Sequence, residues 1–136
     1  GVAGYLARET RPEEPIAAMG VGVLAYYGDR PVVDMLGLTD VHIAHRDVPM
    51  GTGVRGHEKY DADYVLSRRP AFVVLPSREA LTDFVTWPAG AETARTFPGL
   101  PALDDMASNP RFRADYVADR FGTFRRRDRG VAAEER

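Results

Sequence analysis

The sequence contains no cysteine, a single lysine (Lys59) and no long apolar run. The lack of cysteine excludes disulfides, thiol nucleophiles and cysteine-bound zinc, although it does not identify the cellular compartment. A bilayer-spanning helix needs about 20 consecutive apolar residues, and no stretch of the printed chain approaches that length or shows a signal-peptide pattern. These absences predict that the printed sequence forms a soluble domain.

Size and composition are those of one globular domain. The chain has 136 residues, of which 44% are hydrophobic and 28% charged, and its net charge is −2. That charge provides no electrostatic footprint for a polyanion, so we expect no nucleic-acid partner. The segment Gly1–Arg8 reads as the end of a helix already under way, which suggests a fragment of a longer protein. We expect a single α/β domain over residues 1–127 and a charged, disordered tail over 128–136.

Short β-branched and apolar runs alternate with segments of helical spacing. The strands are expected over Pro15–Met19, Pro31–Leu36, Ala71–Leu75 and Gly122–Arg127. This alternation predicts a small three-layer α/β fold, Rossmann-like, with a mostly parallel sheet and helices on both faces. The helices are expected over Val23–Tyr27, Val41–Arg46, Ala62–Arg69, Arg78–Val85 and Phe112–Arg120, with Thr39 or Asp40, Asp61 and Ser77 as caps and Thr86–Pro101 as an irregular loop.

Two glycine-rich segments match nucleotide-binding patterns. Gly20–Ala25 fits G-x-G-x-x-A directly after a strand, with Asp34 at the end of the next strand, where a ribose-binding acid would lie. The 14-residue spacing from Gly20 to Asp34 is shorter than the usual value of about 20, and a tight turn needing small residues explains the glycines equally well. Gly51–Gly56 also spells G-x-G-x-x-G but does not follow a strand, so a loop is the better interpretation.

Histidines and carboxylates offer weaker signals. His42 and His45 stand three residues apart beside Asp40, but no third metal ligand is fixed by spacing, so we expect no metal site and no cofactor. Asp34, Asp40, His57 and Glu58 are candidates for general acid–base work, against the alternative that the aspartates satisfy loop amides. The run Arg125–Arg127 with Arg129 is typical of a solvated tail, with a phosphate contact as the alternative.

The most distinctive part of the chain lies between Ile16 and Pro76. Its segments Val33–Ala44 (VDMLGLTDVHIA), Gly56–Lys59 (GHEK) and Asp63–Pro70 (DYVLSRRP) resemble the C-terminal soluble domain of bacterial membrane glycosyltransferases of the C-type superfamily. That superfamily includes the actinobacterial terminal arabinofuranosyltransferases. One departure is that this chain has Val41 and His45 where the family pattern would place an arginine, which argues against a conserved basic contact in that helix.

The resemblance implies a location and a role. An N-terminal transmembrane region of the same protein would hold the polyprenyl-phosphate sugar donor and the catalytic carboxylate. This domain would lie on the extracytoplasmic side of the cell membrane, where it covers the active site or guides a cell-wall glycan acceptor. It would have no catalytic residue and no activity alone.

A ligand site is expected where the strands end. In open parallel sheets, ligands bind beyond the carboxyl ends of the strands, and the loop with GHEK could fold over that edge. The residues expected to contact a sugar or phosphate are Asp34, Asp40, His42, His57, Glu58 and Lys59, with Tyr26 and Tyr27 as aromatic faces. Three alternatives remain: the edge only docks on the membrane region, the chain is a free-standing Rossmann-like nucleotide-binding protein, or it is a pure interaction module.

Overall fold

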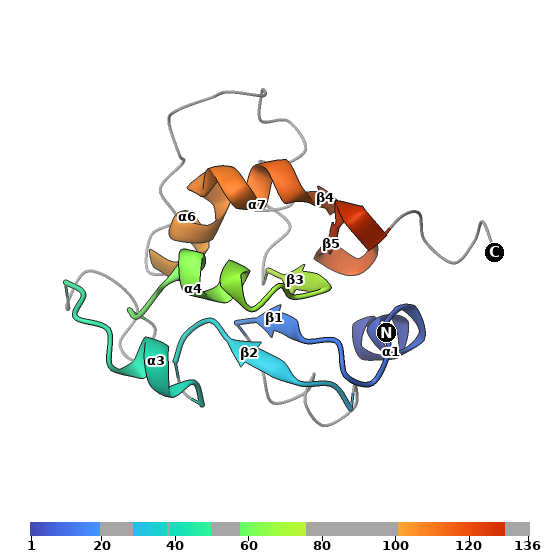
Figure 1. The fold of residues 1–136 in the computed structure, drawn as a ribbon, viewed down its shortest axis with the longest axis horizontal. Helices are drawn as coiled ribbons and strands as arrows, with labels where there is room; N and C mark the ends of the chain where they lie inside the picture. The colour runs from blue at the N-terminus through green and yellow to red at the C-terminus, as the bar shows by residue number, and fades with distance from the viewer. Residues whose placement is uncertain (20–28, 38, 50–57, 76–100, 130–136) are drawn as a thin grey trace.

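The computed structural model describes residues 1–19, 29–37, 39–49, 58–75 and 101–129, and Figure 1 shows their arrangement. The described strands form one five-stranded sheet. Helices α4, α6 and α7 lie together on one side of this sheet, and α1 lies beside the strands at the other (Figure 1).

The sheet is mixed, and its strand order is β2-β1-β3-β5-β4. β1 pairs in parallel with both β2 and β3, whereas β5 pairs antiparallel with both β3 and β4. The strands are β1 (Ile16–Ala18), β2 (Val32–Asp34), β3 (Phe72–Val74), β4 (Tyr116–Ala118) and β5 (Thr123–Arg126).

The prediction of a mostly parallel, Rossmann-like fold is therefore wrong. Only four residues, 119–122, connect β4 to β5, and a parallel connection needs a crossover of a dozen or more residues. The C-terminal part of the chain consequently forms an antiparallel hairpin, and β5 of that hairpin completes the sheet against β3. The first three strands follow the predicted parallel pattern, but the last two do not.

All four predicted strands are present, and each is shorter than predicted. β3 shows why an apolar run predicted a strand. Its Phe72 and Val73 are fully buried, and the strand is paired on both sides. A strand in that position favours a continuous apolar sequence rather than an alternating one.

The helices are short. Asp40 caps α3 (Val41–Ala44) and Asp61 caps α4 (Ala62–Ser67), as predicted, each accepting a bond from a backbone N–H of the first turn. The other helices are α1 (Val2–Glu9), α6 (Pro101–Ser108), α7 (Pro110–Asp115) and the 3-10 turns η1 (Arg120–Gly122) and η2 (Arg127–Arg129).

One predicted helix is half wrong. Phe112–Arg120 was expected to be helical, but α7 ends at Asp115 and the chain becomes extended at Tyr116, which begins β4. Phe112 and Tyr116 are both buried and their rings are 5.5 Å apart, so the four-residue spacing fits a shared core without a continuous helix. α6, within a segment not assigned to any element, was missed.

Apolar side chains form two cores on opposite faces of the sheet. Successive residues of a strand point to opposite faces, and Ala17 belongs to one core whereas Ile16 and Ala18 belong to the other. The larger core lies under α4, α6 and α7, and the smaller one lies under α1, where Leu6 is fully buried.

Three of the four C-terminal arginines, Arg125, Arg126 and Arg129, make ion pairs with the folded domain, whereas Arg127 is exposed. Arg125 pairs with Asp119 at 3.0 Å, and Arg129 pairs with Glu14 at 2.8 Å with both side chains largely buried. Asp128 and Arg129 thus contact the folded domain, beyond the expected boundary at residue 127. Within the described ranges, no helix is long and apolar enough to cross a bilayer. The predicted helices Val23–Tyr27 and Arg78–Val85 lie outside these ranges.

Candidate functional site

The turn after β2 is held together by Asp34. The side chain of Asp34 is buried, and its carboxylate accepts bonds from the backbone N–H groups of Leu36 (3.0 Å) and Thr39 (2.7 Å) and from the Thr39 hydroxyl (3.3 Å). Gly37 in this turn has φ +78°, and a Cβ there would lie 2.8 Å from the backbone nitrogen of Ala44. Asp34 therefore positions the following segment of the chain.

Asp40 links α3 to α4. Its Oδ1 accepts from the backbone N–H of Ile43 at 3.1 Å, and its Oδ2 accepts from the hydroxyl of Tyr64 at 3.0 Å. The Tyr64 hydroxyl in turn accepts from Nη1 of Arg68 at 3.3 Å. This chain of bonds fixes the phenol of Tyr64 beside the first turn of α3.

The imidazole of His42 stacks on the ring of Tyr64. The ring centroids are 3.9 Å apart and the planes are inclined by 14°. Nε2 of His42 lies 2.8 Å from Oδ2 of Asp61, and a carboxylate can only accept, so this nitrogen carries the proton. The His42 side chain is still 48% exposed, which leaves part of the imidazole open to solvent.

Asp61 is the electrostatic centre of this group. Burial alone would raise the pKa of its carboxyl, but the hydrogen bonds from His42 and the Tyr64 backbone and the charge of Arg46 outweigh burial and lower the pKa. Nε of Arg46 lies 3.4 Å from Oδ2 of Asp61. Asp61 therefore stays ionised in the folded protein at neutral pH.

We call Asp40, His42, Asp61 and Tyr64, with Arg46 and Arg68 at its border, the edge cluster. Of these six, the sequence predicted Asp40 and His42 as ligand contacts and Asp61 only as a cap. Tyr64 and the two arginines were missed as site residues. For Tyr64 and Arg68, the spacing along α4 could have indicated a shared site. Asp61, Tyr64 and Arg68 follow each other at three- and four-residue intervals, which places them on one helical face.

Two further predicted contacts, Glu58 and Lys59, precede α4 in the chain. Glu58 is 5% exposed and belongs to the protein interior, and Nζ of Lys59 donates to the backbone carbonyl of Arg46. His45, which the sequence offered only as a possible metal ligand, is exposed at the end of α3. Three further predicted contacts, Tyr26, Tyr27 and His57, lie outside the described residues, as does Gly51–Gly56.

In the edge cluster, carboxylates that hold backbone amides lie beside the ring stack. The carboxylates of Asp34, Asp40 and Asp61 all accept backbone N–H bonds, so each already has a positioning role. Among the described residues, no group of three or more histidines and carboxylates is arranged to hold a metal ion. The cluster instead offers a partly open ring stack beside carboxylates and guanidinium groups.

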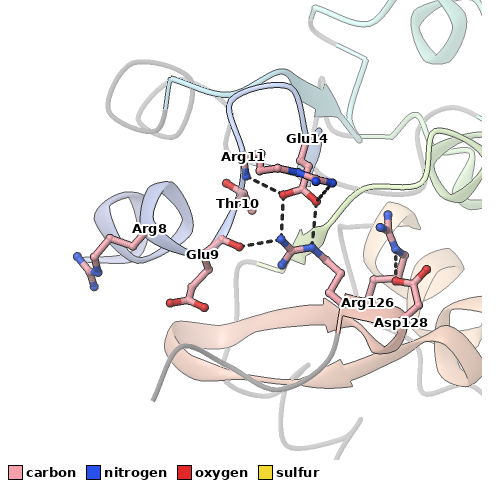
Figure 2. A pocket seen from close by; sticks show the side chains of 8 residues that line it. Arg8, Glu9, Thr10, Arg11, Glu14, Arg126 and Asp128 are labelled. Carbon is pink, nitrogen blue, oxygen red and sulfur yellow. Dashed lines mark hydrogen bonds and ion pairs between the residues drawn. The ribbon is translucent and has the colours of Figure 1, made fainter. Parts of the chain in front are cut away.

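A second candidate is a charged pocket of about 420 Å³ between α1 and the end of β5, drawn in Figure 2. One wall comes from the end of α1 and the following loop, with Arg8, Glu9, Thr10, Arg11 and Glu14. The opposite wall consists of Arg126, Asp128 and Arg129. No pattern in the sequence could predict this pocket, because its walls lie more than 110 residues apart.

Ion pairs and hydrogen bonds join the two walls of the pocket. Nε and Nη2 of Arg129 donate to the two carboxylate oxygens of Glu14, at 3.2 and 2.8 Å, and Nη2 also donates to the carbonyl of Glu9 at 2.8 Å. On the opposite wall, Nε of Arg126 donates to Oδ1 of Asp128 at 2.6 Å. Burial would raise the pKa of Glu14, but its bonds from the Arg11 backbone and from Arg129 hold that pKa below its ordinary value.

Comparison with known proteins gives one family. A family model described as a domain of unknown function, DUF8728, matches residues 1–129. The match ends at Arg129, the last residue of the pocket network. No curated protein and no solved structure matches the chain.

Proposed function

The chain belongs to the DUF8728 family, and we propose that its domain is an accessory, glycan-contacting module of a membrane glycosyltransferase. The parent enzyme would use polyprenyl-phosphate sugars, and this domain would lie on the extracytoplasmic side. It would contribute acceptor binding, while the membrane region would supply the catalytic carboxylate.

The stack of His42 on Tyr64 between two carboxylates carries this proposal. The C–H faces of a sugar ring pack on flat aromatic surfaces, and its hydroxyl groups donate hydrogen bonds to ionised carboxylates. The edge cluster offers both, with Asp61 bonded to the His42 imidazole and Asp40 bonded to the Tyr64 hydroxyl. The segments that resemble the C-type enzymes, Val33–Ala44 and Asp63–Pro70, supply four of its residues.

The geometry also supports a binding role rather than a catalytic one. A general acid or base must be free to exchange its proton with substrate. Asp40 and Asp61 are instead held by helix amides and by neighbouring side chains. Such fixed groups are well suited to orienting an acceptor.

Ligand-observed NMR on the domain tests this proposal directly. Arabinan oligosaccharides and other cell-wall glycans would be screened against the unmodified chain and against His42→Ala and His45→Ala. His45 is the matched control, since it is an exposed histidine at the C-terminal end of the same helix and lies outside the ring stack. We expect glycan signals that His42→Ala reduces at least tenfold and His45→Ala leaves unchanged.

Two results would count against the proposal. Absence of binding by any glycan would favour a docking surface, for which the 69% exposed Val41 beside His42 offers an apolar contact. A gene that encodes no transmembrane segments together with this domain would remove the membrane enzyme altogether.

A further inference from the structure

We propose that the charged pocket between α1 and the end of β5 binds a small oxyanion carried by a larger polar molecule, such as a phosphate ester. This site lies apart from the edge cluster, and the inference does not rest on the glycan proposal. Figure 2 shows the two walls that would face the ligand.

Two largely buried arginines in the pocket, Arg126 and Arg129, each have one guanidinium nitrogen that makes no hydrogen bond within the described chain. Arg126 uses Nε on Asp128 and Nη1 on the backbone carbonyls of residues 69 and 70, but its Nη2 makes no hydrogen bond within the described chain. Arg129 uses Nε and Nη2, and its Nη1 likewise makes none there. Nη2 of Arg126 and Nη1 of Arg129 are not among the buried polar atoms that lack a hydrogen bond. Both nitrogens are therefore open to solvent.

These donors are held in place before a ligand arrives. The side chains of Arg126 and Arg129 are only 19% and 13% exposed, and each guanidinium is anchored by at least three bonds. The guanidinium of Arg129 also lies 5.6 Å from the ring centre of Phe72. Anchored guanidinium forks lose little entropy when they bind an oxyanion, which favours phosphate and carboxylate groups.

The charge of the pocket has the sign that an anion needs. Its walls carry four arginines and three acidic side chains, which leaves one positive charge in excess. The carbonyls at the end of α1, which would repel an anion, are covered: Arg30 donates to those of Ala7 and Thr10, and Arg129 donates to that of Glu9.

The size and lining of the pocket indicate the class of ligand. A volume of about 420 Å³ falls in the range of small-molecule sites and exceeds what a single phosphate fills. Every lining side chain is polar or charged. The ligand is therefore a polar molecule with the oxyanion at one end.

Titration with inorganic phosphate, followed by amide NMR shifts, tests the inference. Arg11→Gln removes a rim charge and Asp128→Asn removes an acid, and both side chains are more than half exposed, so both variants are expected to fold. We expect shifts at Thr10, Arg126 and Arg129, about threefold to tenfold weaker binding in Arg11→Gln and tighter binding in Asp128→Asn. Arg111→Gln, an exposed arginine on α7, is the control and leaves affinity unchanged.

The opposite responses of the two pocket variants separate a site from general attraction. Equal weakening in Arg11→Gln and Arg111→Gln would mean non-specific charge binding and would overturn the inference, as would the absence of shifts in the pocket. Glycerol phosphate and phosphatidylglycerol vesicles then distinguish the source of the oxyanion. Binding of the former alone identifies a soluble ester, and sedimentation with vesicles that Arg11→Gln reduces identifies a lipid headgroup.

Discussion

At the scale of single residues, the distinctive segment Val33–Ala44 contains a turn that Asp34 holds together. Asp34 was predicted both as a ligand contact and as a residue that satisfies loop amides, and its buried carboxylate makes the second set of bonds. The amide role could be read from an aspartate at a strand end. The bond to Asp61 that positions His42 could not, because 19 residues separate them.

Replacing Gly37 with alanine should destabilise the domain. The backbone is at φ +78° and the new Cβ would lie 2.8 Å from the nitrogen of Ala44, so strain and overlap together cost about 2 kcal/mol or more. Urea unfolding measures the change. Gly4→Ala in α1 is the control: its Cβ meets only the Arg8 side chain at 3.6 Å, and we expect a gain of about 0.5–1 kcal/mol. Equal stability of the two variants would contradict this account.

At the scale of elements, strands and capped helices followed from local pattern, whereas the C-terminal hairpin did not. The spacing of Phe112, Tyr116 and Val117 fits a helix. Tyr116 instead pairs with β5, and β5 in turn pairs with β3, which lies far away in the sequence. α6 did carry a usable signal. Pro101 occupies its first position, where proline is favoured, and Ala102, Leu103, Met106 and Ala107 form its buried stripe.

The start of α7 depends on one cap. Oδ1 of Asn109 accepts from the backbone N–H groups of Arg111 and Phe112, and its Nδ2 donates to Asp63 at 2.8 Å. We expect Asn109→Ala to lower the free energy of unfolding by about 1–2 kcal/mol. Asn109→Ser, which keeps a capping oxygen, should lose less than half as much. Chemical denaturation of both variants provides the measurement, and an equal loss would show that the cap is not the cause.

At the scale of the whole molecule, the edge that the parallel-sheet hypothesis selected does gather Asp40 and His42 with α4, although the sheet is mixed. That part of the hypothesis needed only β1, β2 and β3, whose pairings are parallel. The charged pocket depends on the pairing of β5 with β3, which brings Arg129 to Glu14. Long-range pairings of this kind leave no local pattern in a sequence.

The bond between Glu14 and Arg129 should make stability depend on pH. Because the folded pKa of Glu14 lies below its ordinary value of 4.5, the stabilisation is complete above that value and disappears as pH falls through the folded pKa. At pH 7, Glu14→Gln should cost about 1–3 kcal/mol, and the difference from the unmodified chain should shrink in acid. Thermal unfolding between pH 7 and 3 measures it. Glu13→Gln, at a 70% exposed side chain, should change stability by less than about 0.5 kcal/mol, and a larger effect there would discount the network.

The order of the strands along the chain also determines which part of the sheet is synthesised first. The ribosome completes β3 about 40 residues before it reaches β4. Until the hairpin of β4 and β5 is made, the apolar segment Ala71–Leu75 is therefore the unpaired edge of an incomplete sheet. An unpaired apolar strand is a template for joining another chain. Polypeptides truncated before β4 should therefore self-associate during synthesis, whereas chains that reach Arg129 close their own sheet.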